Sequence, residues 1–359
     1  MRFLKTEFEI VSFNLPSNEE YSREVWKVSG EKVSVLVLNY NGRPLLEECF
    51  SSLGKQTYPD QKVYLVDNGS QDGSAEYVRK EFPWVRIIRI EKNCGITGAY
   101  NHAVKLIDAP YFAFLNNDVR VKEDWLEELV KALESDPLAA AAGSKIYFYD
   151  RPDTIHSVGL MITPVGIGCD MGLGEKDRGQ YNERGYWGGV SGASMLMRTS
   201  LFREVGGFDE SYFAYNEDVD LCWRLLLRGH RMVFQPSSVM YHKVGSTNGP
   251  RLSPVRVYYM QKNALRNILK NFEVVGVLRG LVISSFYAGL RFLIYLFSGR
   301  WDLAGALARG SVEPLTDLPG IFVQRKKIQA QRVVSDRSLE RAGYSVSFLE
   351  TVREYFRIL

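Results

Sequence analysis

The chain has 359 residues, of which 45% are hydrophobic and 24% charged, and both fractions are ordinary for a folded globular protein. This composition excludes long disordered stretches, and the length allows one large domain or two smaller ones. The formal net charge of +3 gives no reason to expect a nucleic-acid partner, although Lys and Arg gather towards the C-terminus.

The cysteines and the N-terminal residues indicate the compartment of the protein. The four cysteines are far apart and include no CxxC pair, which favours free thiols in a reducing compartment over disulfides or a zinc site. They are Cys49, Cys94, Cys169 and Cys222. Residues 1–31 are polar with scattered aromatic side chains and begin with no apolar run, so we expect an N-terminal extension without a secretory signal. The sequence therefore predicts a cytoplasmic protein.

Strands and helices alternate through the first third of the chain. Apolar runs predict strands at 33–38, 62–66, 85–89 and 111–115, with helices between them at 43–56, 73–81 and 97–107. This alternation predicts βαβ units, and hence an α/β fold with a mostly parallel sheet flanked by helices. Such open sheets bind ligands beyond the carboxyl ends of their strands. Asn39, Asp67 and Asp118 follow those ends, so they mark a candidate site.

The rest of the chain divides into two parts. Glycines and aromatic residues become frequent from about 143 to 250, where we expect strands of mixed sense around a helix at 218–228. The composition changes again near residue 255. The predicted domains are therefore the extension 1–31, a core domain 32–253 and a C-terminal helical region 254–359.

One stretch of the C-terminal region, residues 274–298, is apolar enough to contact a membrane. Arg279 and Arg291 interrupt it, and a spanning helix needs about 20 mostly apolar residues, so the arginines argue against a transmembrane segment. A helix lying in the membrane interface fits better, with arginines at the headgroups and aromatic side chains directed inward. The alternative is a helical hairpin packed on the core domain, or on a second subunit of a homo-oligomer.

Asp118 is the first candidate metal ligand. It follows a strand and two asparagines, and a Mg²⁺ or Mn²⁺ ion that bridges two phosphates needs a few hard oxygen ligands on a rigid edge. The alternative role for Asp118 is to cap a helix predicted to begin near residue 122. His242 becomes a second ligand only if the fold brings it to the same place.

Three carboxylates in four residues, Glu217, Asp218 and Asp220, form the second candidate site. Like charges this close raise one another's pKa, and a raised pKa suits a general base. On a helix, Glu217 and Asp220 share one face while Asp218 points elsewhere. The alternative is an acidic first turn that complements the helix dipole, which explains the charge but not the aromatic and glycine-rich surroundings.

Glycines between 188 and 207 mark tight turns or close backbone approach, on which a sugar ring could rest. Two well-known phosphate-binding patterns are absent from the sequence. Because there is neither a GxxxxGK[ST] nor a GxGxxG pattern, a P-loop nucleotide hydrolase and a dinucleotide-binding fold are both unsupported.

Six short motifs follow one another within residues 33–250. They are Val35–Asn41, Val66–Ser74, the pattern Asn93-x-Gly95-x-x-Gly98-x-x-Asn101, Leu115–Asp118, Gly206–Glu210 and Glu217–Leu221. In this order and spacing they resemble the family-2 glycosyltransferases of the GT-A fold. The subgroup they resemble most comprises the rhamnosyltransferase-like enzymes that build cell-surface glycans.

The resemblance implies a reaction and assigns residues to it. The reaction is an inverting transfer of a sugar from a dTDP-, UDP- or GDP-sugar to a glycan or polyprenyl-diphosphate-linked acceptor. Asp218, in the Glu217–Asp218 pair, would be the catalytic base, and Asp118 and His242 would hold a divalent metal, Mg²⁺ or Mn²⁺. The donor-binding positions would be Leu38 (through its backbone), Tyr40, Asp67, Asn93, Asn116, Asn117, Gly189 and Gly192.

Asn116 departs from the family pattern. It occupies the first position of the family's DXD motif, where an aspartate would add a charged ligand. We therefore expect weaker metal binding than in relatives with two aspartates, but not its loss.

Two other functions compete with this interpretation. A nucleotidyltransferase would show a glycine-rich loop with Lys or Arg after the first strand, whereas this loop reads Asn41-Gly42-Arg43-Pro44. A catalytically inactive sugar-binding scaffold would not need Asp118 and Asp218, which are both present. With a lipid-linked acceptor, we expect the enzyme to be peripheral at the inner face of the cell membrane.

Overall fold

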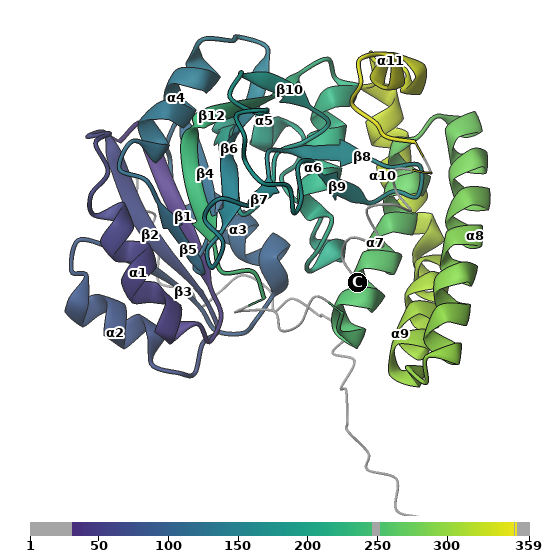
Figure 1. The fold of residues 1–359 in the computed structure, drawn as a ribbon, viewed down its shortest axis with the longest axis horizontal. Coiled ribbons are helices and arrows are strands. Elements are labelled where there is room, and N and C mark those ends of the chain that lie inside the picture. Colours follow the sequence, from purple (N-terminus) through teal and green to yellow (C-terminus); the bar gives the residue numbers. More distant parts are fainter. Residues whose placement is uncertain (1–30, 246–251, 348, 350–359) are drawn as a thin grey trace, which may run out of the picture.

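The structure, a computed structural model, describes residues 31–245, 252–347 and 349. In this part of the chain, a ten-stranded sheet with helices on both faces lies beside a bundle of C-terminal helices (Figure 1). The predicted N-terminal extension, residues 1–31, lies outside the described residues except for Glu31.

The first part of the sheet is parallel, as predicted. Its strands are β1 (Val33–Asn39), β2 (Gln61–Asn68), β3 (Arg86–Ile90) and β4 (Tyr111–Asn116), and its helices are α1 (Arg43–Leu53), α2 (Ser74–Glu81) and α3 (Gly95–Leu106). Strand β1 pairs in parallel with both β2 and β4. Its apolar run is buried because helices cover both faces of the sheet, which is why the sequence shows no polar alternation. The predicted strands and helices all form, with ends that coincide or are shifted by at most three residues.

The second part of the chain adds strands of mixed sense. The strands are β5 (Val119–Val121), β6 (Ala139–Phe148), β7 (Ile155–Ser157), β8 (Leu160–Ile162), β9 (Gly168–Asp170), β10 (Gly185–Trp187), β11 (Ser194–Arg198) and β12 (Arg231–His242). The helices are α4 (Trp125–Glu134), α5 (Thr199–Glu204), η1 (Glu210–Tyr212) and α6 (Glu217–Leu227). The sheet order is β10-β12-β6-β11-β4-β1-β2-β3, with β11 antiparallel to both neighbours. The sheet is therefore mostly parallel in its first half and mixed in its second, as expected.

Two apolar clusters fix the helices on the two faces of the sheet. Trp125 of α4 packs with α1 on one face, and Trp223 of α6 packs with α3 on the other. Both tryptophans are fully buried, and burying a side chain of this kind contributes about 2–3 kcal/mol or more. Because Trp223 fixes α6 in this way, the first turn of the helix reaches the carboxyl edge of the sheet.

The C-terminal region is helical, as predicted, and α7 begins at Pro254. Its elements are α7 (Pro254–Asn271), α8 (Val274–Phe297), α9 (Trp301–Val312), η2 (Glu313–Asp317), α10 (Leu318–Ala330) and α11 (Asp336–Arg341). Helix α7 packs against α6 on one side and against α9 on another. Figure 1 shows α7 between the sheet domain and α8, which lies at the outer edge of the molecule. The family motifs thus end before a helix that is part of the core packing.

Candidate active site

A pocket of about 320 Å³ opens where β1, β2 and β4 end and α6 begins. This is the place at which open parallel sheets bind ligands. Ten of the twelve residues predicted for the site line it, and Asp67 and Gly189 are the two that do not. The ten are Leu38, Tyr40, Asn93, Asn116, Asn117, Asp118, Gly192, Glu217, Asp218 and His242.

Asp118 and His242 meet because β5, which follows Asp118, pairs with the end of β12. Nε2 of His242 lies 3.1 Å from Oδ1 of Asp118 and 3.4 Å from Nδ2 of Asn116. Both side chains are about nine-tenths buried, and Nδ1 of His242 has no hydrogen-bond partner among the described residues. Asp118 does not cap the next helix, because α4 begins only at Trp125.

The charges around the pocket fit a divalent cation. Four carboxylates line it, and Arg256 is the one Lys or Arg in its described lining. They are Asp118, Asp170, Glu217 and Asp218. A nucleoside diphosphate would add more negative charge, so binding it here calls for a further cation. Asp118 offers a hard oxygen and His242 an imidazole, and Mg²⁺ or Mn²⁺ accepts these with phosphate oxygens and water. Within the described ranges, no group of three His, Cys, Asp or Glu side chains could hold a metal.

Glu217 and Asp218 open α6, and both line the pocket. Glu217 is buried, and its Oε2 has no hydrogen-bond partner in the described part of the chain. Asp218 is half-buried and accepts hydrogen bonds from the backbone N–H groups of Gly192 at 2.9 Å and Val219 at 2.8 Å. Burial raises the pKa of both carboxyls, and the charge of Asp218 adds to the effect on Glu217, whose pKa rises to about 8. The backbone donors favour the ionised form of Asp218, so Asp218 is the carboxyl of the pair that ionises more readily.

The turn before α6 has an unusual backbone. Three of its non-glycine residues have positive φ angles, a conformation that costs on the order of 1–3 kcal/mol at each residue. They are Phe213 (63°), Tyr215 (67°) and Asn216 (62°). Nδ2 of Asn263, a buried residue of α7, donates hydrogen bonds to three carbonyl oxygens of this turn. These belong to Tyr212 (3.1 Å), Ala214 (2.8 Å) and Tyr215 (2.7 Å). Asn263 therefore holds the turn that delivers the two pocket carboxyls.

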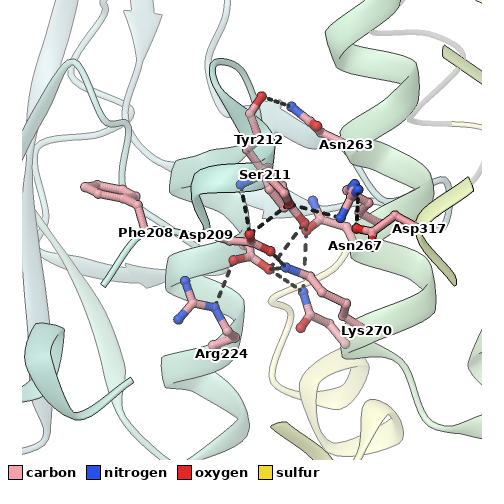
Figure 2. Close-up of polar contacts among 12 residues, drawn as sticks. Phe208, Asp209, Ser211, Tyr212, Arg224, Asn263, Asn267, Lys270 and Asp317 are labelled. Carbon is pink, nitrogen blue, oxygen red and sulfur yellow. Dashed lines mark hydrogen bonds and ion pairs between the residues drawn. The ribbon is translucent and has the colours of Figure 1, made fainter. Parts of the chain in front are cut away.

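Asp220 has a different environment, and Figure 2 labels two of its partners, Arg224 and Lys270, together with Asp209. Lys270 of α7 is 1% exposed, and its Nζ lies 2.5 Å from Asp209 and 2.9 Å from Asp220. Nε of Arg224 lies 2.8 Å from the other oxygen of Asp220. Burial alone would raise the pKa of both aspartates, but the cations outweigh it and hold both pKa values below the ordinary range. Asp220 therefore belongs to a buried ion cluster.

The helix periodicity predicted that Glu217 and Asp220 share a face while Asp218 points elsewhere, and this is wrong. Glu217 and Asp218 face the pocket together, and Asp220 faces α7. Glu217 is the first residue of α6, so its direction follows the preceding turn rather than the helical repeat. The alternative of an acidic first turn is correct in that all three carboxyls lie in the first turn of α6. It does not explain why two of them face the pocket and the third faces α7.

Asp67 and Gly189 lie outside the pocket lining. Asp67 is fully buried at the end of β2, and neither carboxylate oxygen has a hydrogen-bond partner within the described ranges. Its nearest cation is Arg89, with Nε at 4.0 Å. Gly189 lies behind the wall, where a Cβ would come 3.3 Å from Cβ of Cys222. Their roles in donor binding stay predictions.

Two predicted donor-binding asparagines also shape the wall of the pocket. Nδ2 of Asn117 donates to Oδ1 of Asn39 at 2.6 Å, and Oδ1 of Asn93 accepts from Nδ2 of Asn68 at 2.9 Å. Gly95, the next residue but one, has φ of +76°, and a Cβ there would lie 2.4 Å from the carbonyl oxygen of Phe213. These contacts tie the strand ends to the turn before α6.

Several residues that line the pocket were missed by the sequence prediction. Asn68 lies inside the predicted Val66–Ser74 motif, so a signal was available. Arg256 and Met260 come from α7, beyond the family motifs, and no short pattern pointed to them. The Arg256 guanidinium lies over the ring of Tyr215, 5.3 Å from its centroid, which places a cation beside the turn before α6.

None of the four cysteines forms a disulfide within the described residues; Cys49, Cys169 and Cys222 are buried and Cys94 is partly so. The reducing compartment stays a prediction.

Comparisons with known sequences agree with the motifs. The model of the glycosyl transferase family 2 matches residues 34–206. N-acetylglucosaminyl-diphospho-decaprenol L-rhamnosyltransferase of Mycobacterium tuberculosis is 32% identical over 238 residues, with 59% of this chain and 76% of that protein covered. Poly-beta-1,6-N-acetyl-D-glucosamine synthase of Staphylococcus aureus is 24% identical over 221 residues, covering 61% of this chain and 52% of that protein.

Two solved structures share the fold. GalNAc-T7, crystallised with UDP, GalNAc and Mn²⁺, has a TM-score of 0.55 at 17% identity; 67% of this chain and 48% of that chain are covered. A mannosyltransferase from Pyrobaculum calidifontis, in complex with GDP-Man and Mn²⁺, has a TM-score of 0.50 at 18% identity, covering 85% and 88%. These similarities establish the GT-A fold that the motifs predicted. Together with the sequence relatives, they show that the chain belongs to glycosyltransferase family 2 and is a glycosyltransferase.

Proposed function

We propose that this glycosyltransferase inverts the configuration of the transferred sugar in a single displacement, with Asp218 as the base. The observation that supports this is the unequal environment of two adjacent carboxyls. Glu217 is buried with its pKa raised to about 8, so it is protonated near neutral pH, while backbone donors favour ionised Asp218. Asp218 takes the proton of the acceptor hydroxyl as that oxygen attacks the anomeric carbon from the face opposite the diphosphate. No covalent intermediate is needed.

The proposed donor is a nucleoside-diphosphate sugar carrying dTDP, UDP or GDP. Leu38 and Tyr40 line the pocket where the nucleobase and ribose would lie, and the buried oxygens of Asp67 accept no hydrogen bond within the described residues. Asp118 and His242 would hold Mg²⁺ or Mn²⁺, and a bound ion supplies neutralisation of the charge on the leaving diphosphate. The two solved neighbours, which contain Mn²⁺ with UDP or GDP-Man, support this choice of ligands.

The proposed acceptor is a hydroxyl of a glycan or of a polyprenyl-diphosphate-linked sugar. The Mycobacterium tuberculosis relative is named for a decaprenol-linked acceptor, which supports the lipid-linked class. Arg256 offers a positive charge to an anionic acceptor at the side of the pocket formed by α7.

The substitution Asp218→Asn tests the base. General-base catalysis typically contributes about 10²–10⁴-fold, so kcat should fall by that factor while donor binding persists, because the amide keeps the shape of the carboxylate. Release of nucleoside diphosphate measures the rate, and NMR of the anomeric proton identifies the product configuration. Glu217→Gln, which mimics the protonated neighbour, serves as the control and should retain far more activity. A variant Asp218→Asn that kept most of its rate, or a product with retained configuration, would overturn the assignment.

A chelation experiment tests the metal separately. Full removal of divalent ions should abolish transfer, and Mn²⁺ should restore it. Activity unchanged after full chelation would remove Asp118 and His242 from this role. Pyrophosphate as the released product would favour a nucleotidyltransferase, for which no observation in the pocket argues, and an absence of donor turnover would favour the inactive scaffold.

A further inference from the structure

The outermost helix of the C-terminal bundle presents an apolar face. Of the eleven exposed positions of α8, eight carry large apolar side chains and one, Arg279, is charged. Six of the apolar residues recur every three or four positions, so they form one continuous face, here named the α8 stripe. The stripe consists of Leu278, Val282, Phe286, Leu290, Leu293 and Phe297, which are 37–88% exposed. Figure 1 shows α8 on the side of the bundle that faces away from the sheet.

The second arginine of this apolar stretch does not interrupt the stripe. Arg291 is buried, and its guanidinium lies 5.4 Å and 5.8 Å from the ring centroids of Tyr287 and Tyr295. The two rings and the arginine are thus on the inner side of α8. In the sequence, Arg291 argued against a spanning helix and was expected at the headgroups of an interfacial one. That expected position is wrong, because the fold places Arg291 on the inner side of α8.

Helix α8 is long and apolar enough to cross a membrane by length and composition. Its connections argue against that orientation, because α7 and α9, which flank it in the chain, pack tightly on each other. A Cβ at Gly310 of α9 would lie 2.6 Å from the carbonyl oxygen of Tyr258 in α7, and Val257 shares a buried cluster with Leu303. A spanning α8 would carry these two helices, with their ionised side chains, into the hydrocarbon. Helix α8 therefore does not cross a membrane, and its exposed side is the surface that a partner would contact.

The distribution of charge distinguishes between two partners for the stripe. Residues 254–347 contain 14 Lys and Arg and six Asp and Glu, a net charge of +8, whereas residues 31–253 contain 25 and 29, a net charge of −4. Of the exposed charged side chains in 254–347, seven are basic and two, Asp302 and Glu340, are acidic. A second copy of this chain would bring a surface of the same sign, but an anionic bilayer would bring the opposite one.

We propose that the α8 stripe is a membrane-docking surface that lies in the headgroup–acyl boundary of an anionic bilayer. Basic amphipathic surfaces bind there through buried apolar area and attraction to anionic lipid. One end of the stripe carries exposed aromatic and basic side chains that are close together in the chain, namely Phe297, Arg300 and Trp301. Such a combination suits the membrane interface.

Docking through α8 also gives the enzyme a location. Helix α7 lines the pocket with Arg256 and Met260 and packs on the bundle, so a docked bundle holds the pocket beside the membrane. The cytoplasmic leaflet is the anionic one, which agrees with the expected inner-face location. That docking serves delivery of a lipid-linked acceptor rests on the proposed function, whereas docking itself can be measured without donor or acceptor.

The test is flotation of the full chain with vesicles of phosphatidylcholine, with and without phosphatidylglycerol. We expect binding to the anionic vesicles that is at least about tenfold tighter than to neutral ones and that weakens with added salt. The double variant Val282→Gln/Phe286→Gln should bind anionic vesicles at least about tenfold more weakly. Leu138→Gln, at a 48% exposed leucine of the sheet domain, is the matched control and should bind like the unsubstituted chain. Thermal unfolding checks that the variants remain folded.

Three outcomes would overturn the proposal. They are no binding to either vesicle, equal binding by the double variant, and a dimer in light scattering that the double variant dissociates while vesicle binding is unaffected. Transfer to a water-soluble acceptor separates docking from catalysis, because the double variant should keep it. Absence of that activity in the unsubstituted chain would contradict the proposed function and leave the docking result intact.

Discussion

Helix α6 carries two kinds of carboxyl within its first four residues. Glu217 and Asp218 line the pocket, and burial raises their pKa values. In the described part of the chain, neither has a Lys or Arg in ion-pair contact. Asp220 is buried more deeply than either, but Lys270 and Arg224 hold its pKa below the ordinary value. The difference comes from α7. Its Lys270 supplies a cation to Asp220, whereas its Asn263 supplies only an amide to the turn that precedes Glu217 and Asp218. Carboxyls with counter-ions fix the helix, and those without are available for proton transfer.

The largest expected effect is the loss of stability when the buried ion cluster of Asp209, Asp220, Arg224 and Lys270 loses a cation. Lys270→Met would leave Asp209 and Asp220 buried with less counter-charge, and breaking such a pair costs about 3–5 kcal/mol. Urea unfolding should show a loss of this size. Lys262→Met is the matched control on the same helix, because Lys262 faces the partly exposed Glu313 at 3.6 Å and should cost clearly less. Equal losses in the two variants would contradict a special role for the cluster.

The second largest effect is expected from the turn before α6, which Asn263 holds in place. Asn263→Ala would remove the side-chain donor to three carbonyl oxygens, of which only that of Tyr212 keeps a backbone donor, from Ala214. We therefore expect a loss of about 2 kcal/mol in stability. Because the turn positions Glu217 and Asp218, kcat should fall about tenfold or more, and the pH profile of kcat should shift while KM for the donor changes little. Asn267→Ala removes hydrogen bonds with Gly166, Tyr212 and Asn271 but no donor to the carbonyl oxygens of the turn, so it is the control for the loss of buried polar contacts on the same helix. An unchanged pH profile in Asn263→Ala would show that the amide acts on stability only.

The smallest expected effect concerns Glu217 and has the opposite sign. Its pKa rises from 4.5 to about 8 on folding, so between these pH values the folded protein keeps a proton that the unfolded chain releases. The free energy of unfolding should therefore fall as the pH rises through this window. Glu217→Gln removes the ionisation, so the variant should be more stable than the unsubstituted chain above pH 8, with little difference below pH 4.5. Denaturant unfolding at both pH values measures this.

The ion cluster should produce the reverse pH dependence in the same experiment. Asp209 and Asp220 have lowered pKa values, so their stabilisation is fully present above the unfolded pKa near 3.8 and is lost as the pH falls through the lowered values. Glu217→Gln should still lose stability at acid pH, and above pH 8 it should be more stable than the unsubstituted chain. Both results together would confirm that the two sites titrate separately. If Glu217→Gln were no more stable than the unsubstituted chain above pH 8, Glu217 would not be the carboxyl that keeps its proton on folding.

Much of the fold and part of the site could be predicted from local sequence. The apolar runs at 33–38 and 111–115 identified buried strands, and the polar residues that follow them lie at the pocket because parallel strands end at one edge. The motifs also placed Asp118 and Asp218 in one family of enzymes. These features are short-range, since a strand, its end and the residue that follows are adjacent in the chain.

The sequence by itself thus determined the order of elements, the family and the set of carboxyls from which the site is built. Only the tertiary structure decided which carboxyl is which, because Lys270 and Asn263 reach α6 and its turn from about 50 residues away, and no local pattern encodes that contact. The same holds for Arg291, which the sequence placed at the lipid headgroups and which the fold instead buries on the inner side of α8. Charge and periodicity are local properties, but whether a charge is paired, buried or exposed is decided by segments far away in the chain.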